Sequence, residues 1–192
     1  MAVKTIQTIL NEIAATLPDN TTGLITPAAL RAALNDMCES LFTRSATMYG
    51  SLGAGVAQSI TTTPTNYPVL MPAAINSNPA LFTVNSVAGT ITAARGGFGY
   101  TLNANMVWQA GSINTELDAT VFRNGVAYNR ARVEQTGPTQ NRPYSASFSV
   151  VIAGVTDGEV FEVRLSSPQG PISITFFSMD FTVALNPTLT AI

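Results

Sequence analysis

The sequence predicts a mainly β protein. An antiparallel β-sandwich over residues 67–192 follows a small helical segment at 1–44 and a linker at 45–66. Apolar residues recur at every third or fourth position in the first segment, which is the period of a helix. From about Tyr67 onward they alternate with polar residues, which is the period of a strand. Glycine, proline and asparagine separate the alternating runs, as they do in turns between short strands.

The helical segment contains two predicted helices, each with one apolar face. The first runs from about Val3 to Leu17 and ends before Pro18, because a residue before proline avoids the α region. The second begins at Thr26-Pro27, where threonine is a favourable N-cap and proline suits the first helical position. We expect the two apolar faces to anchor the chain to a partner through Ile6, Ile9, Ile13, Leu30, Leu34, Met37 and Leu41.

Residues 45–66 (SATMYGSLGAGVAQSITTTPTN) are rich in glycine, alanine, serine and threonine. Such a stretch has few apolar side chains to bury, so we predict a linker or an extended arm. The alternative is a loop that belongs to the sandwich domain.

The longest alternating run covers residues 98–109, with an apolar face that includes Tyr100 and Trp108. A second run at 113–121 leads into Asn124-Gly125, the strongest short-range signal for a two-residue hairpin turn. A plain hairpin would pair Leu117 with Arg132, which is a poor match. We therefore expect a bulge in this hairpin or an early end of its pairing.

Three further strands are expected. The first ends near residue 152, and a turn at Asp157-Gly158 leads to the second at 161–165. In the last part, at 172–185, the apolar positions change parity at Phe176-Phe177, which marks a turn or bulge between two strands. Many strands at short spacing favour a sandwich or a jelly roll.

Residues 145–185 resemble the closing half of the TNF/C1q-like jelly roll. Val155–Gly158 stands at the Gly-Asp type turn, and Phe177–Phe181 stands at the last strand, although the glycine of that strand's motif is absent. Gly97–Tyr100 opens a long strand as in that fold, while the opening signature of C1q domains is not evident around residues 67–82. The resemblance implies a homotrimer with apolar and aromatic residues along its threefold axis. The aromatic candidates for that axis, or for the core, are Tyr100, Trp108, Phe148, Phe176, Phe177 and Phe181.

Asp19–Arg31 (DNTTGLITPAALR) resembles a short turn-helix segment that is common near the start of bacteriophage tail, fibre and head-fibre proteins. This resemblance makes a structural virion protein the leading hypothesis. Residues 1–44 would attach it to the capsid or tail, and a trimeric jelly roll would project for assembly or adhesion. Its partners would be copies of itself, other virion proteins and a host or environmental glycan. The alternative is a soluble carbohydrate-binding jelly-roll module of a non-viral protein.

The composition excludes several kinds of chemistry. The chain has no histidine and one cysteine, so it can build neither a Cys/His zinc site nor a histidine general base. Its formal net charge of −2 gives no basic footprint for nucleic acid. We therefore expect a non-enzymatic protein without catalytic residues, cofactor or metal ion.

Four sets of polar or reactive residues are candidate sites. Glu116 and Asp118 lie two residues apart on one face of a strand. A glycosidase, such as a polysaccharide-degrading tail spike, would need its two carboxyl groups on opposite sides of a sugar-binding cleft. We therefore interpret the pair as part of a solvated strand face. Asp157-Gly158-Glu159 lacks the ligand series of a calcium loop and is interpreted as a turn. Cys38 has no histidine base, so a buried small side chain is expected. Arg123, Arg130 and Arg132 are interpreted as ordinary surface arginines rather than a receptor-contact patch.

The sequence also suggests where the protein is found. The first residues lack the uninterrupted apolar stretch of a secretory signal, and the uncharged stretch between Arg44 and Arg95 is broken by polar residues, glycine and proline. We expect no membrane insertion. The expected location is the virion, after synthesis in the host cytoplasm.

Overall fold

The computed structural model describes Asn11, Ala15 and residues 44–190, and nearly all of the described chain belongs to one compact unit, Arg44–Ile192. Apart from Asn11 and Ala15, which are helical, the two predicted helices lie outside the described residues. So are Cys38 and the anchor positions Ile6, Ile9, Ile13, Leu30, Leu34, Met37 and Leu41. In the part of the chain that is described, no helix is long and apolar enough to cross a membrane.

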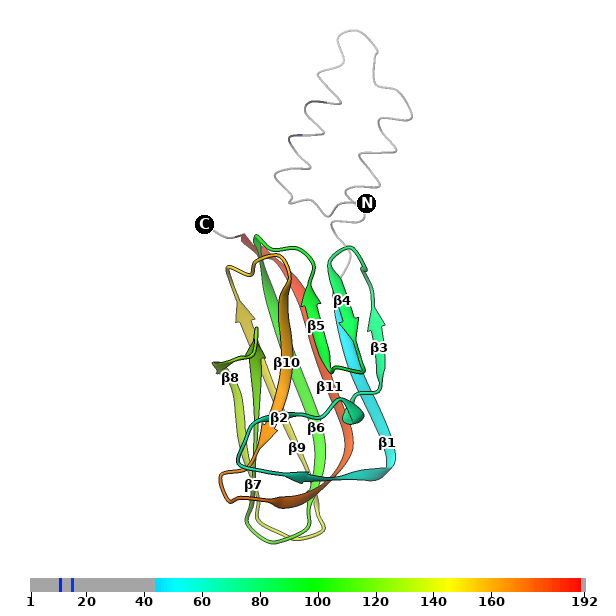
Figure 1. Ribbon diagram of the computed structural model, residues 1–192, viewed down its shortest axis with the longest axis vertical. Helices are drawn as coiled ribbons and strands as arrows, with labels where there is room; N and C mark the ends of the chain where they lie inside the picture. Colours follow the sequence, from blue (N-terminus) through cyan, green and yellow to red (C-terminus); the bar gives the residue numbers. More distant parts are fainter. Residues whose placement is uncertain (1–10, 12–14, 16–43, 191–192) are drawn as a thin grey trace. The chain divides into compact units, whose positions relative to one another are not determined.

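Arg44–Ile192 forms two antiparallel sheets whose strands run roughly along the vertical axis of Figure 1. Sheet A has the order β3-β1-β11-β6-β9, made of Ala73–Asn76, Ser45–Ile60, Ile172–Thr190, Phe98–Ala110 and Pro143–Ile152. Sheet B has the order β4-β5-β10-β7-β8, made of Phe82–Asn85, Thr90–Ala93, Glu159–Ser166, Thr115–Arg123 and Val126–Gly137. Strand β2 (Thr65–Asn66) pairs with β10, and a short 3-10 helix, η1, covers Pro68–Leu70.

The chain crosses between the sheets at every connection except the β4–β5 and β7–β8 hairpins, and the first strand pairs with the last. This connectivity is that of a double-sheet jelly roll, which pairs distant strands and leaves few long edges. The predicted class, a mainly β antiparallel sandwich, is confirmed.

The expected linker at 45–66 is wrong for most of its length, because Ser45–Ile60 is strand β1. Ala46, Met48 and Ile60 are fully buried, and β1 pairs with β11 on one side and β3 on the other. The side chains of this strand are small, so the alternation of apolar and polar residues is weak in the sequence. Backbone hydrogen bonds between strands form whatever the size of the side chains. The sandwich therefore begins at residue 44 rather than 67.

The predicted strand at 98–109 is confirmed as β6, and it forms the centre of the core. Its inward residues Tyr100, Leu102, Ala104, Met106 and Trp108 are at most 1% exposed. The ring of Tyr100 meets that of Phe82 from sheet B edge to face, with centroids 5.8 Å apart. Burial raises the pKa of the Tyr100 phenol to about 12, with a further contribution from Asp157, and its hydroxyl donates a hydrogen bond to the carbonyl of Arg95.

The Asn124-Gly125 hairpin and its expected bulge are both confirmed. Asn124 and Gly125 have φ angles of 51° and 76°, the left-handed pair that a type I′ turn requires. The register between β7 and β8 then shifts between Thr120 and Phe122. As a result Leu117 pairs with Gln135 instead of Arg132.

The parity change at Phe176-Phe177 is a bulge inside a single strand, so the expectation of two strands there is wrong. Strand β11 continues through it, with the register toward β6 shifting between Phe176 and Ser178. On the other side, the register toward β1 shifts between Ser51 and Val56, so that Leu52–Gly55 has no ladder partner in β11. Paired irregularities of this kind bend a sheet without ending it.

Candidate assembly face

The outward side chains of four strands in sheet A form a regular array. Strands β1, β11, β6 and β9 pair in register, so outward residues line up in four rows across the sheet. We call these residues the outer grid: Ser45, Ala184, Thr101, Val151; Thr47, Thr182, Asn103, Ser149; Tyr49, Asp180, Asn105, Ser147; Ser51, Ser178, Val107, Ser145. None of them is buried in the isolated chain.

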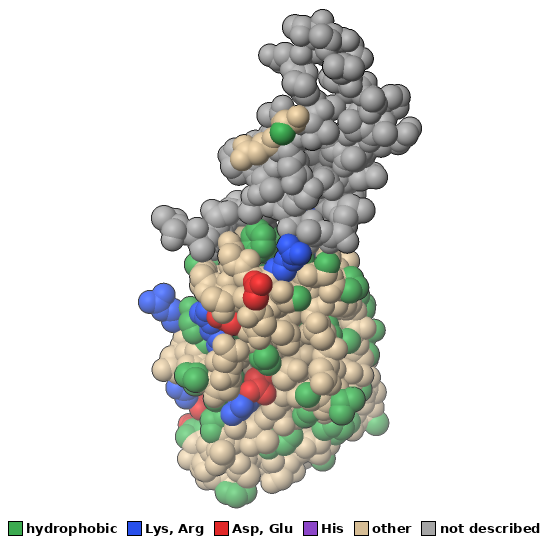
Figure 2. All heavy atoms as spheres, turned by 45° about the horizontal axis from the view of Figure 1, so that its top comes forward, with side chains coloured by type: hydrophobic (Ala, Val, Ile, Leu, Met, Phe, Trp, Pro, Cys, Tyr) green, Lys and Arg blue, Asp and Glu red, His purple; other side chains and the backbone are tan. Residues whose placement is uncertain are grey.

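The outer grid is almost free of charge. Asp180 is its only charged residue, and it is also the only charged residue in the five strands of sheet A. Strands β7, β8 and β10 of sheet B carry three charged residues each: Glu116, Asp118, Arg123; Arg130, Arg132, Glu134; Glu159, Glu162, Arg164. In Figure 2 the visible charged side chains gather on one side, and the rest of the visible surface is hydrophobic or uncharged.

Hydrogen bonds hold four polar side chains of the outer grid in place. Asn105 donates from Nδ2 to Oδ1 of Asp180 across 2.9 Å, and the hydroxyls of Thr47 and Thr182 lie 2.8 Å apart. Two apolar side chains stand exposed among them, Tyr49 at 38% and Val151 at 47%. A face of short, fixed polar groups with a few apolar ones needs little reorganisation to be covered by another protein surface.

Strand β9 ends sheet A beside this face, and its open edge lacks the features that usually prevent strand pairing. Those features are charge, a bulge, or a very short strand. The edge strand β8 carries arginines and a bulge, and β3 and β4 have four residues each. Strand β9 has ten residues and no charge, its register with β6 is unbroken, and its only proline is the first residue.

The structure separates the six aromatic candidates into two groups. Tyr100, Trp108, Phe176 and Phe181 are fully buried in the core of the chain. Phe148 and Phe177 are half-buried. Phe177 lies at the bulge of β11, where its ring would come within 3.1 Å of a Cβ added to Gly55. The exposed aromatic of the outer grid, Tyr49, was missed because it stands in the expected linker, although Tyr49 alternates with the buried Met48 and Gly50.

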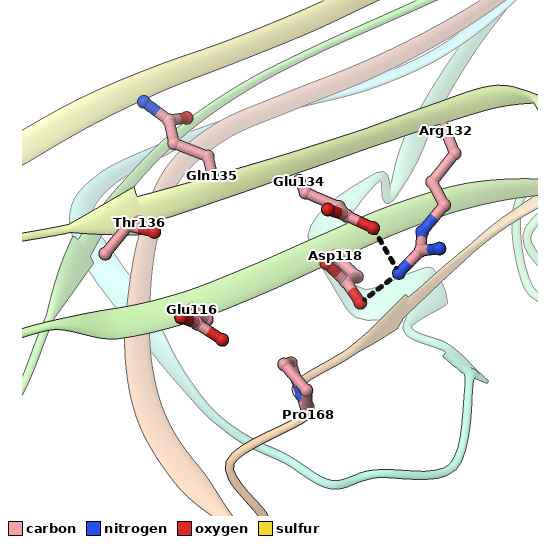
Figure 3. Close-up of a pocket in the computed structure, with 7 residues that line it drawn as sticks. All are labelled: Glu116, Asp118, Arg132, Glu134, Gln135, Thr136 and Pro168. Atoms are coloured by element: carbon pink, nitrogen blue, oxygen red, sulfur yellow. Dashed lines mark hydrogen bonds and ion pairs between the residues drawn. The ribbon is translucent and has the colours of Figure 1, made fainter.

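A polar hollow of about 430 Å³ lies on sheet B, between β7, β8 and the loop before β11. We call it the β7–β8 hollow; it is lined by Glu116, Asp118, Arg132, Glu134, Gln135, Thr136 and Pro168. Figure 3 shows Asp118 and Glu134 turned toward Arg132, whose Nη2 lies 2.8 Å and 2.6 Å from their carboxylates. The hydrogen bond to Asp118 raises the pKa of Arg132, so this guanidinium stays charged. Glu116 and Asp118 thus line one hollow rather than a fully solvated face, and Asp118 is 8% exposed.

The remaining sites from the sequence are ion pairs and turns. Asp157-Gly158 is a turn, with Gly158 at a φ of 80°. Arg123 binds Glu159 through two hydrogen bonds of 2.6 Å. Two of the three arginines considered as a receptor patch are therefore held in ion pairs, while Arg130 is exposed. Among the described residues, no group of three histidine, cysteine, aspartate or glutamate side chains could hold a metal ion.

The fold and its surface define a class: an antiparallel jelly-roll sandwich with one charged sheet and one nearly uncharged sheet. No protein-family model matches the sequence, and no curated protein matches it. Among solved structures, the crystal structure of murine APRIL at pH 5.0 is similar to the chain, with a TM-score of 0.45 and 10% sequence identity. The match covers 73% of this chain and 98% of that chain.

Proposed function

We propose that the chain is a non-enzymatic structural component of a bacteriophage particle, which assembles as a homotrimer and displays its jelly roll for particle assembly or adhesion. The observation that carries the proposal is the outer grid of sheet A, in which Asp180 is the only charged residue. The sequence resemblance of Asp19–Arg31 to phage tail and fibre segments supports the particle. Residues 1–44 would bind a capsid or tail protein, and the virion would be the protein's location. We propose no cofactor, nucleic-acid partner or membrane insertion.

Self-association explains why charge is absent from one sheet only. Around a symmetry axis, each residue near the axis meets its own copies, so a charge there faces the same charge. Protein interfaces are accordingly depleted of charged residues at their centres. A surface that only faced water would have no reason to hold a single charged residue in five strands while three strands opposite carry nine.

A ring of three copies also needs two different surfaces that fit each other, because contacts around a threefold axis are head to tail. Sheet A offers both surfaces side by side: the outer grid and the open edge of β9. We propose that the β9 edge of one copy packs against the outer grid of the next. The half-buried Phe148 and Phe177 and the exposed Tyr49 would become covered in this contact.

Sedimentation equilibrium of the full chain at micromolar concentration tests the trimer. We expect a particle of three times the chain mass of 20.1 kDa. A monomer at every concentration tested would contradict the proposal. The fragment 67–192 is unsuitable for this measurement, since it would lack β1 from sheet A.

Removal of residues 1–44 tests the attachment to a particle. We expect the shortened chain to keep its oligomeric state and to lose incorporation into particles. Unchanged incorporation would contradict the anchor.

The β7–β8 hollow favours a second candidate function, a carbohydrate-binding module. Its carboxylates and the guanidinium of Arg132 could accept and donate hydrogen bonds to the hydroxyls of a sugar. Titration calorimetry with a panel of oligosaccharides tests this candidate. Binding that is lost in Glu116→Gln, by a chain that associates with no particle, would favour it over the virion protein.

A further inference from the structure

We propose that protonation of Asp180 controls self-association, so that copies of the chain bind one another more tightly as the pH falls. This inference rests on the proposed function, because it assumes that the outer grid is the contact surface. It adds a regulatory residue and a direction of pH dependence to that contact.

Asp180 is central on the outer grid. Its strand β11 lies between β1 and β6, so its row runs Tyr49–Asp180–Asn105–Ser147 across the sheet. A carboxylate at the rim of an interface could keep its water, whereas one at the centre is covered by the partner. Covering Asp180 therefore means removing water from a charged group.

Among the described residues, the strands around Asp180 supply no positive charge. From β6 it faces Asn105, which donates one hydrogen bond to Oδ1, and from β1 it faces Tyr49. Its neighbours on the outward side of β11 are Ser178 and Thr182, and no lysine or arginine occurs in any strand of sheet A. Tyr49 is the other titratable group in the outer grid, and a phenol is never a cation, whichever of its two forms is present.

The strand that we propose to cover the outer grid carries no cation of its own. The edge strand β9 that we propose to cover the grid contains Tyr144 as its only titratable side chain. Arg142 comes just before β9 and lies five residues from Ser147, the grid residue in the row of Asp180. At about 3.3 Å per residue this is roughly 16 Å along the strand, beyond the reach of an arginine side chain.

The sign of the pH dependence follows from these contacts. A carboxylate that loses water without gaining a cation is less stable in its charged form, so association favours the neutral acid. The assembly then binds more protons than the separate copies do, and linkage makes association stronger as the pH falls.

Sedimentation equilibrium of the full chain between about pH 7.5 and about pH 5 tests the inference, because this range ends just above the ordinary titration of carboxylates. We expect the association constant of the unmodified chain to rise by about tenfold or more across it, since each proton taken up can contribute up to about tenfold per pH unit. Asp180→Asn should associate at about pH 7.5 at least as tightly as the unmodified chain does at the acid end, with a flat profile.

Glu162→Gln is the matched control, because it also changes a carboxylate to an amide, but on sheet B. It should keep the pH dependence of the unmodified chain. Circular dichroism is used to check that both variants fold. Asp180→Asn should fold because asparagine keeps the side-chain oxygen that accepts the hydrogen bond from Asn105.

Several results would overturn the inference. One is a sloping profile in Asp180→Asn, and another is a flat profile in Glu162→Gln. A third is weaker association at low pH, which would mean that a cation from another copy does reach Asp180. If the unmodified chain and Asp180→Asn are both monomeric throughout, the proposed self-association fails together with its regulation.

Discussion

At the scale of single residues, sheet B holds its charges in pairs that depend on buried carboxylates. Glu159 is 5% exposed and accepts hydrogen bonds from Arg123 and from the hydroxyl of Thr156. Burial by itself would raise the pKa of Glu159, but the hydrogen bonds from Arg123 and Thr156 outweigh it, and the pKa is lowered. A carboxylate whose pKa is lower in the folded chain than in the unfolded chain stabilises the fold at any pH above its unfolded-state pKa. This stabilisation is lost as the pH falls through its folded-state pKa.

Arg123→Ala should therefore destabilise the fold by about 1–3 kcal/mol at neutral pH, because it leaves the buried Glu159 carboxylate without its cation. This loss of stability should be smaller at about pH 3. At that pH Glu159 is protonated in the unfolded chain and is increasingly protonated in the folded variant, so less charge is left without a partner. Urea unfolding at the two pH values measures both effects. Arg130→Ala, at an exposed arginine of β8, should change the free energy of unfolding by less than about 0.5 kcal/mol. Equal losses for Arg123→Ala at both pH values would contradict this account of the pair.

At the scale of elements, the bulge in β1 depends on two glycines with different surroundings. Gly53 and Gly55 have φ angles of 54° and 95°, in the left-handed region that favours glycine. A Cβ on Gly53 would meet nothing within 4 Å. A Cβ on Gly55 would overlap Cγ2 of Thr175 and lie 3.1 Å from the ring of Phe177. Gly55 is thus the point at which the irregular parts of β1 and β11 pack together.

Gly53→Ala should cost about 1–2 kcal/mol, the backbone term for a side chain in the left-handed region. Gly55→Ala should cost more, by about 1–3 kcal/mol, because Thr175 and Phe177 must also move. Chemical denaturation of both variants measures the difference. Equal costs would mean that Phe177 does not pack on β1.

A strand could be predicted from the sequence where large apolar side chains occupy alternate positions. Strand β6 was evident because Tyr100, Met106 and Trp108 fill alternate positions, and the hairpin because Asn124-Gly125 has one favoured turn. Strand β1 was not, since alanine, glycine and serine fill its alternate positions and carry a weak period. The same composition is typical of a flexible arm, and only the pairing of β1 with β11 in the structure distinguishes the two.

At the scale of the whole molecule, the division of charge between the sheets depends on which strands pair with one another. A sequence pattern within one strand cannot show this pairing. The low charge content was plain in the sequence. That Tyr49, Asp180, Asn105 and Ser147 form one row depends on the register of strands far apart in the chain. Self-association accounts for this division, because a nearly uncharged face can be covered by the edge of another copy without burying many charged groups.

The central claim is that the outer grid is the surface through which copies of the chain associate, and a pair of matched substitutions tests it most directly. Asn103→Glu places a second carboxylate at the middle of the grid, one row from Asp180, and Asn129→Glu makes the same change at an exposed position of β8 in sheet B. Sedimentation equilibrium of both full-length variants, with folding checked by circular dichroism, measures the effect. We expect a folded monomer for Asn103→Glu and the oligomer of the unmodified chain for Asn129→Glu. An oligomer that survives Asn103→Glu would contradict the claim.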